Sequence, residues 1–560
     1  MYIILLECHI IPLSMSEFNS SSHHVLLTIF FRSLRLHFIM LKRILLLTSV
    51  YLFVVGLEGS ALSISTSHNL PVIPTAYVLN GTYTGIHSPE YNQDFFLGIP
   101  YAQPPVGELR FRQAQPLNDS WPDSKNATSY SLECIGYGSD QWNLGNQISE
   151  DCLTLNVIRP ATTKTSNNFS KLPVAVWIHG GSFTEGGSAD PRYNLSFIVQ
   201  ESVNSGMPFI GVSINYRLSA WGFLFGEEVM SAGSANMGIR DQRLALHWVQ
   251  ENIAAFGGDP RRVTVWGESA GAMSIGMHLI AYGGRDDGLF SAAISESGTP
   301  PGIVSTAITP ASWQPFYDRI TKAANCSTAA DSLECLRTVP LDTLSAIFNS
   351  SVTQGASFSP VVDGDFIPAG SSSLLLSGQF VKVPYLMGVN HDEGSAFAPR
   401  GINTTSQFLY LLTSFGLDNT TATALATLYP DDPDQGIPPT FLGRPPASQL
   451  WGSQFKRVAA LVGDIAMHAP RRLTNQMWAK YGAKSYAYDF DMIPNGHSQE
   501  AGATHFMEVP FVFCDFDGLG YEDGQKPFTG KPAYYEDLAG QIARAWIAFI
   551  GTGDPNSAGE

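Results

Sequence analysis

The stretch "VTVWGESAGAMS", residues 263–274, decides the fold of this chain. Four apolar or β-branched residues lead into the pentapeptide Gly267–Gly271, which has Ser269 at its centre, and small residues follow. Glycine supplies 52 of the 560 residues, so a Gly-x-Ser-x-Gly pattern says little by itself about a nucleophile. A strand before the pattern and a helix after it predict a sharp turn that holds Ser269 at the C-terminal edge of a sheet.

The neighbouring segments alternate between strand patterns and helix patterns. The predicted strands are residues 172–181, 208–217, 261–266, 383–390 and 484–492, and the predicted helices are residues 237–256 and 534–555. The first helix carries its apolar residues on one face and ends at Gly257-Gly258. Because strands and helices alternate along the chain, and because the strands have apolar centres that fit burial on both sides, we expect an α/β fold with a large, mostly parallel central sheet and helices on both faces.

A serine hydroxyl needs a general base, and the base needs a group that orients it. On this fold the chain order is serine, then acid, then histidine. Asp392 and Glu393 follow a predicted strand and are the candidate acids. His497 and His505 follow the last predicted strand and are the candidate bases. Spacing alone does not choose within either pair.

A site for acyl chemistry also needs backbone donors for the negative charge that develops on the carbonyl oxygen. The segment Gly180-Gly181-Ser182 follows a predicted strand and lets the backbone approach a substrate closely. Together with the amide of Ala270, at the start of the next helix, it predicts a cradle of three donors.

Composition bounds the partners and the compartment. The chain is 44% hydrophobic, only 14% charged and has a formal net charge of −17, which argues against nucleic acid or an anionic membrane surface as a partner. Few charges and many Asn-x-Ser/Thr sequons predict a glycosylated, secreted protein. After residue 61 these sequons begin at Asn80, Asn118, Asn126, Asn168, Asn194, Asn325, Asn349, Asn403 and Asn419.

The N-terminal region reads as a leader and a signal peptide. From Met40 onward, Lys42 and Arg43 precede an apolar run, residues 44–57, and small residues end at Ala61. We expect residues 1–39 to be a leader outside the true protein and residues 40–61 to be a cleaved signal peptide. Residues 62–560 are expected to form one catalytic domain, with no stable membrane anchor after cleavage.

The six cysteines fit an oxidising compartment. Cys134 and Cys152 are close enough in sequence for a local bridge, and so are Cys326 and Cys335. Cys514 is left over and is expected to be buried. No group of histidines and cysteines has the spacing of a zinc site, so neither a metal nor another cofactor is expected.

Longer stretches carry a family resemblance from about residue 75 to the C-terminus. They include "FLGIPYAQPPVGELRF" (96–111), "SEDCLTLNV" (149–157), "VSINYRLSAWGFL" (212–224), "GIRDQRLALHWVQENIAAFGGDPRRVTVWGESAGAMS" (238–274), "GVNHDEGSAF" (388–397) and "HFMEVPFVF" (505–513). The sequence resembles the type-B carboxylesterases and lipases, the α/β-hydrolase family of the cholinesterases, bile-salt lipase and the secreted yeast lipases. Its motifs are most similar to those of the secreted fungal lipases.

The resemblance implies a choice within each open pair. It assigns the acid to Glu393 and the base to His505, with Ser269 as the nucleophile. It also implies that the oxyanion donors are the amides of Gly181, Ser182 and Ala270, and that the disulfides are Cys134–Cys152 and Cys326–Cys335.

The sequence departs from the family pattern at three places. Ser182 stands where the family has glycine or alanine, the loop 134–152 is shorter than the lid of the yeast lipases, and the sequence ends at "GTGDPNSAGE", before the family's usual Trp-Pro segment and further helix. The C-terminal end is therefore expected to be truncated. The resemblance implies a secreted serine hydrolase that cleaves small-molecule or lipid carboxylic esters through an acyl-enzyme. A true lipase or sterol esterase on long-chain insoluble esters is the alternative, and a non-catalytic adhesion protein is a remote one.

Overall fold

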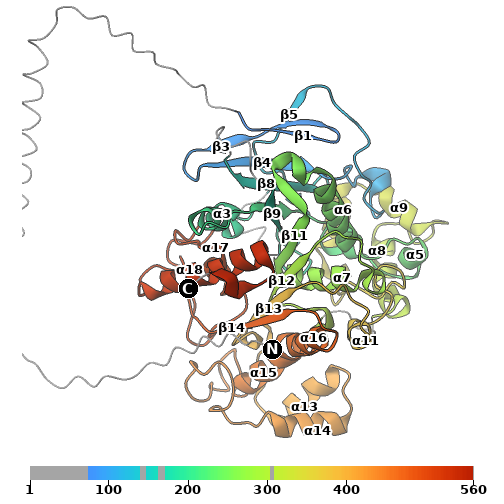
Figure 1. Cartoon of the computed structure of the whole chain (residues 1–560). Coiled ribbons are helices and arrows are strands. Elements are labelled where there is room, and N and C mark those ends of the chain that lie inside the picture. Colours follow the sequence, from blue (N-terminus) through green and yellow to red (C-terminus); the bar gives the residue numbers. More distant parts are fainter. Residues whose placement is uncertain (1–72, 139–146, 162–170, 303–307, 559–560) are drawn as a thin grey trace, which may run out of the picture. The chain divides into compact units, whose positions relative to one another are not determined.

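The computed structural model describes residues 73–138, 147–161, 171–302 and 308–558 (Figure 1). The predicted leader, the predicted signal peptide and the sequon at Asn168 lie outside these residues. In the described part, no helix combines the length and the apolar character that crossing a membrane requires.

A nine-stranded sheet forms the centre of the fold, in the order β14-β13-β12-β11-β9-β10-β8-β4-β3. Its strands are β3 (Ile86–Ser88), β4 (Gln93–Pro100), β8 (Thr154–Pro160), β9 (Leu172–Ile178), β10 (Ile210–Ile214), β11 (Gly258–Glu268), β12 (Ala292–Glu296), β13 (Tyr385–Asn390) and β14 (Ser485–Phe490). All neighbours from β14 to β10 are parallel, whereas β8, β4 and β3 join antiparallel. The predicted mostly parallel α/β sheet is confirmed, and the antiparallel edge is an addition that the sequence patterns did not predict.

Strand β9 shows why its residues had to be apolar throughout. Val174, Val176 and Ile178 belong to one core, and Ala175 and Trp177 belong to the core on the other face. Side chains alternate between the two faces of a strand, so a strand covered on both sides buries its side chains on both faces. The predicted strand at residues 172–181 is therefore a buried central strand.

Helices cover each of these two faces (Figure 1). Helices α6 (Met237–Asn252) and α7 (Ala270–Gly284) supply residues to the first core. Helices α3 (Leu195–Asn204), α17 (Val509–Phe513) and α18 (Tyr534–Thr552) supply residues to the second. This arrangement is the helix-sheet-helix layering expected for an α/β fold.

The predicted helix at residues 237–256 consists of α6 and a short 3₁₀ turn, Ile253–Phe256. It ends at Gly257, whose φ of 91° lies in the left-handed region that glycine adopts at helix ends. Strand β11 starts directly afterwards at Gly258, earlier than the predicted Arg261. Because β11 begins so early, it pairs with the start of β9 as well as with its centre.

Further short elements complete the described chain. Small sheets are formed by β1 (Thr75–Val78), β2 (Gly81–Thr84) and β5 (Ser124–Asn126), and by β6 (Glu133–Cys134) and β7 (Ile148–Ser149). Helices α4 (Ser219–Phe223) and α5 (Glu227–Ser231) follow β10, and α8 (Pro310–Ala323), α9 (Ser332–Thr338), α10 (Leu341–Phe348) and α11 (Ser371–Leu376) lie between β12 and β13. Helices α12 (Gly394–Phe397), α13 (Thr405–Ser414), α14 (Asn419–Leu428), α15 (Phe455–Gly463) and α16 (Ala469–Lys480) lie between β13 and β14.

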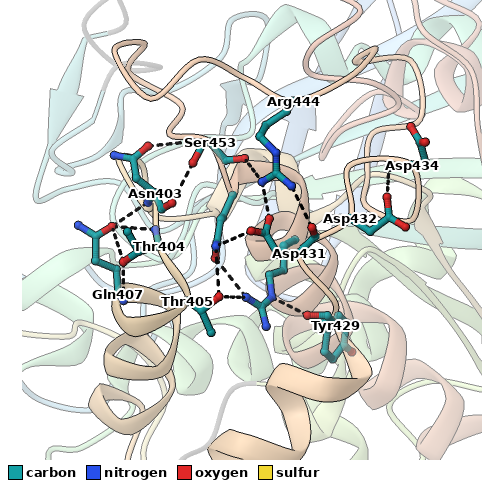
Figure 2. A network of polar contacts seen from close by, with 12 residues as sticks. Asn403, Thr404, Thr405, Gln407, Tyr429, Asp431, Asp432, Asp434, Arg444 and Ser453 are labelled. Carbon is teal, nitrogen blue, oxygen red and sulfur yellow. Dashed lines mark hydrogen bonds and ion pairs between the residues drawn. The ribbon is translucent and has the colours of Figure 1, made fainter.

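Polar contacts hold the long connection between α14 and α15 in place (Figure 2). Arg444 Nη2 donates to the carbonyl of Asp431 at 2.9 Å, and Gln454 Nε2 donates to the Asp431 carboxylate at 2.9 Å. Helix α15 in turn packs so closely on α12 that a side chain at Gly394 would collide with the carbonyl of Ala459. Helix α15 therefore packs directly against the segment that follows Glu393.

Candidate active site

Ser269 lies at a tight turn between β11 and α7. Its φ of 52° and ψ of −120° are unusual for a residue with a side chain, and such strain is common at functional turns. Side chains at Gly267 or Gly271 would collide with the carbonyl of Ile178, at the end of β9. The two glycines of the motif are thus required by close packing of strand and helix, and this is the geometry of a nucleophile elbow.

The imidazole of His505 connects Ser269 with a buried carboxylate. Nε2 of His505 lies 2.8 Å from Ser269 Oγ, and Nδ1 lies 2.7 Å from Glu393 Oε2. The other carboxylate oxygen of Glu393 accepts a hydrogen bond from the Asn390 amide at 2.8 Å and another from the Ser297 hydroxyl. Of the candidate bases, His505 is the one that contacts Ser269, and of the candidate acids, Glu393 is the one that contacts Nδ1 of His505.

Asp392, the other candidate acid, has different partners. Its Oδ2 accepts a hydrogen bond from the Ala503 amide at 2.9 Å, and its Oδ1 lies 3.0 Å from Nδ1 of His391. His497 lies on the loop that leads to His505, and burial lowers its pKa. Neither residue therefore replaces Glu393 or His505 beside Ser269.

The three predicted oxyanion donors lie at the ends of β9 and β11. Gly181 and Ser182 form the turn after β9, with φ values of 94° and 55°, and Ala270 is the first residue of α7. Within the described residues, the N–H groups of these three residues donate to no other atom of the protein. The first N–H groups of a helix lack intrahelical partners, so the Ala270 amide is free to bind an anion.

Buried glutamates surround the imidazole, and the sequence patterns did not single out two of them. Glu268 Oε1 lies 3.2 Å from Nε2 of His505, and Glu508 accepts a hydrogen bond from Asn390 Nδ2 at 2.6 Å. Glu268 directly precedes Ser269, and Glu508 follows His505 by about one helical turn in sequence. This spacing relative to Ser269 and His505 is the only signal that could have identified them.

The carboxyl groups of this cluster cannot all be ionised at neutral pH. Burial raises the pKa of Glu268 and of Glu296 well above that of an ordinary glutamate, and it raises the pKa of Glu508 to about 7. Burial alone would also raise the pKa of Glu393, but His505 and the hydrogen bonds to the carboxylate outweigh burial and lower it. Glu393 therefore ionises more readily than the other carboxyl groups of this cluster.

The same cluster acts on His505. Burial alone would lower the pKa of the imidazole, but the carboxylates of Glu268 and Glu393 outweigh burial and raise it above the ordinary value. Glu268 and His505 thus compete for a proton across a 3.2 Å contact.

Both predicted disulfides are present, Cys134–Cys152 and Cys326–Cys335, and Cys514 is a buried free thiol. A model of the family described as "Carboxylesterase family" matches residues 71–560. The chain belongs to the carboxylesterase family. As a member of this family it is a hydrolase of carboxylic ester bonds, as the resemblance of its motifs implied.

Relatives of this carboxylesterase include named fungal lipases. It is 38% identical over 459 residues to Lipase 1 of Geotrichum candidum, which covers 74% of this chain and 79% of that protein. It is 34% identical over 521 residues to Secreted lipase 1 of Botryotinia fuckeliana (strain B05.10), which covers 86% of this chain and 85% of that protein. Among solved structures, Aspergillus niger EstA matches with a TM-score of 0.72 and 31% identity, over 87% of this chain and 90% of EstA.

Proposed function

We propose that this carboxylesterase is a secreted serine hydrolase that cleaves its ester through an acyl-enzyme, with Ser269, His505 and Glu393 as its catalytic triad. One observation carries the proposal: a continuous chain of contacts runs from Ser269 Oγ through both ring nitrogens of His505 to Glu393. A nucleophile, a base and an orienting carboxylate in this geometry are recognised by their roles and positions, whatever the chain order.

The reaction proceeds in two halves. Ser269 Oγ attacks the carbonyl carbon of the ester while Nε2 of His505 takes the hydroxyl proton. Glu393 accepts the hydrogen bond from Nδ1–H of His505 and balances the charge of the imidazolium. When the tetrahedral intermediate collapses, the alcohol leaves with the proton from His505 and the acyl group stays on Ser269. Water then attacks the acyl-enzyme by the same proton transfers, which releases the acid and restores the serine.

The amides of Gly181, Ser182 and Ala270 are the proposed oxyanion donors. Each N–H group is preset by the turn or helix that holds it, so it binds the developing charge without rearranging at the moment of reaction. The Ser182 side chain is exposed beside this cradle and is therefore able to crowd a bulky substrate.

The pH dependence of the reaction tests the role of Glu268. Replacing Glu268 by glutamine removes a carboxyl group, 3.2 Å from Nε2 of His505, whose ionised form stabilises the protonated imidazole, so the pKa of His505 should fall. The base must be neutral, and activity is lost as the pH falls through its pKa. We therefore expect the acid limb of the kcat/KM profile to move to lower pH in Glu268→Gln.

Glu296→Gln is the matched control for this measurement. Glu296 is equally buried, but its Oε1 accepts hydrogen bonds from the indoles of Trp266 and Trp546, at 2.5 and 2.7 Å. Its substitution should leave the acid limb in place. An acid limb that stays fixed in Glu268→Gln, or moves to higher pH, would count against the electrostatic role of Glu268.

The first part of the 134–152 loop favours soluble or short-chain esters. Ile135 is buried in the core cluster that contains Trp221, and the Tyr137 hydroxyl accepts a hydrogen bond from the Trp221 indole at 3.0 Å. These contacts fix the described start of the loop against the protein, which favours a fixed wall over a lid that opens. A true lipase is the second candidate, because relatives of this chain are named lipases.

A series of nitrophenyl esters from acetate to palmitate separates the two candidates. Rates are measured below and above the solubility limit of each ester. We expect the highest kcat/KM with short acyl chains and no increase in rate when the substrate forms a separate phase. A jump in rate above the solubility limit would assign the protein to the lipases.

Two features support the proposal that this enzyme acts outside the cell. Disulfides persist in oxidising compartments, and the described chain contains two of them. Relatives from Botryotinia fuckeliana and Gibberella zeae are named secreted lipases. Detection of the active protein in the culture medium of an expressing fungus, and not in washed cells, tests this localisation.

A further inference from the structure

The loop that carries His505 has little regular structure of its own. Strand β14 ends at Phe490, α17 begins at Val509, and the residues between them form neither helix nor strand. Ordering a free chain segment costs conformational entropy, so such a loop keeps one conformation only if other elements hold it. The contacts that hold it decide where the imidazole lies relative to Ser269.

Asp392 grips this loop at Ala503 with two hydrogen bonds. The Asp392 amide donates to the carbonyl of Ala503 at 2.9 Å, and the Ala503 amide donates to Asp392 Oδ2 at 2.9 Å. Asp392 and Ala503 are 1% and 0% exposed, so water cannot replace these bonds. The carboxylate thus reaches past its own backbone and fixes the chain just before His505.

Two neighbours of Asp392 strengthen the same contact. Asn390 Nδ2 donates to the carbonyl of Thr504 at 2.7 Å, and the Ser395 hydroxyl lies 2.6 Å from the carbonyl of Ala501. The segment that carries the acid is therefore bonded along the residues that lead to the base.

Gly502 is shaped to fit the Asp392 carboxylate. Its φ is 67°, and a side chain at this position would collide with Asp392 Oδ2. Such a side chain would also collide, less closely, with Pro438 Cβ, so the closer of the two collisions is with the carboxylate that binds the Ala503 amide. The absence of a side chain at Gly502 and the carboxylate of Asp392 are thus two parts of one contact.

We propose that Asp392 is a positioning residue in the ester hydrolysis. It holds the backbone before His505, while Glu393 holds the imidazole ring of the same histidine. This inference rests on the proposed function, because it assigns His505 as the base. Asp392 touches no reacting atom and acts only through the position of His505. The adjacent carboxylates of Asp392 and Glu393 thus divide the task between backbone and side chain.

Substitution of Asp392 tests the proposal, with a soluble short-chain nitrophenyl ester as the substrate. Asp392→Ala removes the acceptor and should lower kcat about 10- to 100-fold while KM changes by less than about threefold, because a displaced base impairs chemistry more than binding. Asp392→Asn keeps one acceptor oxygen for the Ala503 amide and should recover most of kcat. Because loss of folded protein would also lower the apparent kcat, kcat is calculated per folded molecule, with the folded fraction measured by circular dichroism, and only a positioning role leaves a lowered kcat after this correction.

Asp491→Asn is the matched control. One side-chain oxygen of Asp491, one of Asp392 and a ring nitrogen of His391 all lie within 4.8 Å of one another. This variant therefore removes a nearby negative charge without changing the bonds between Asp392 and Ala503. It should keep the kcat of the wild type. The inference is overturned if Asp392→Ala keeps kcat within about twofold, or if Asp392→Asn falls as low as Asp392→Ala.

A glycine pair keeps the test decisive if Asp392→Ala does not fold. Gly502→Ala and Gly443→Ala replace glycines with φ values of 67° and 69°, but only the first meets the Asp392 carboxylate, since Gly443 faces open space. Gly502→Ala should lower kcat about 10-fold or more at an unchanged KM, and Gly443→Ala should not. Equal kcat values in the two variants would overturn the inference.

The wild type separates this inference from the proposed function. If the wild type cleaves no ester, the proposed function fails. If it cleaves esters and Ser269→Ala does not, but the Asp392 and Gly502 variants remain as active as their controls, only the positioning role of Asp392 fails.

Discussion

Ser269→Ala is expected to lower kcat by at least about 10⁴-fold, because the acyl-enzyme cannot form without the serine oxygen. Water attacking directly, with the oxyanion donors still in place, leaves only a small residual rate. The measurement is the hydrolysis of a soluble nitrophenyl ester by purified protein. Covalent labelling by a fluorophosphonate probe should disappear in the same variant.

Ser274→Ala is the control on the same helix. The Ser274 hydroxyl donates to the carbonyl of Ala270 at 2.8 Å and accepts a hydrogen bond from Gln242 at 2.9 Å. Its loss should lower the free energy of unfolding by about 1–3 kcal/mol, because the buried Gln242 amide loses its acceptor. Labelling and turnover should remain. Hydrolysis at the wild-type rate by Ser269→Ala would refute the assignment of the nucleophile.

His505→Gln is expected to lower kcat by about 10³- to 10⁴-fold, because the serine then lacks a base. The glutamine side chain cannot take the proton from Ser269 Oγ, which lies 2.8 Å from Nε2 in the native protein. The pH dependence of kcat/KM should lose its acid limb, since the group that titrates has been removed.

His497→Gln is the matched control, on the same loop and with the same change of side chain. It should keep kcat and the acid limb of the wild type. If His497→Gln instead loses activity as severely as His505→Gln, the base would have to be reassigned.

The parts of the fold that sequence predicted best are those with one strong physical cause. Strand β9 had to be apolar at every position from Val174 to Ile178, because helices cover both faces of the sheet. Helix α6 carried an apolar face and a glycine stop. The strands β3, β4 and β8 lie at one side of the sheet, join antiparallel and follow no such pattern, so their pairing depends on tertiary contacts.

The candidate site divides in the same way. The glycines around Ser269 mark the turn in the sequence because close packing on β9 excludes side chains there. Spacing could not separate Asp392 from Glu393, because both directly follow the same strand. Which of the two carboxylates points toward His505 depends on side-chain direction, which the sequence does not give. Family resemblance chose Glu393, and the geometry agrees with that choice. The contact of Glu268 with His505 was not predicted, because a single glutamate in a motif forms no recognisable pattern.

The distance along the chain between the two partners of the central contact has a consequence for biosynthesis. Ser269 and His505 are 236 residues apart, and the strands β12, β13 and β14 are all added between them. A chain emerging from the ribosome therefore completes its nucleophile turn long before the histidine has been translated. On the proposed mechanism, such a chain cannot hydrolyse esters until β14 has joined the sheet and His505 has reached Ser269. Ester turnover is, for the same reason, a stringent reporter of completed long-range folding.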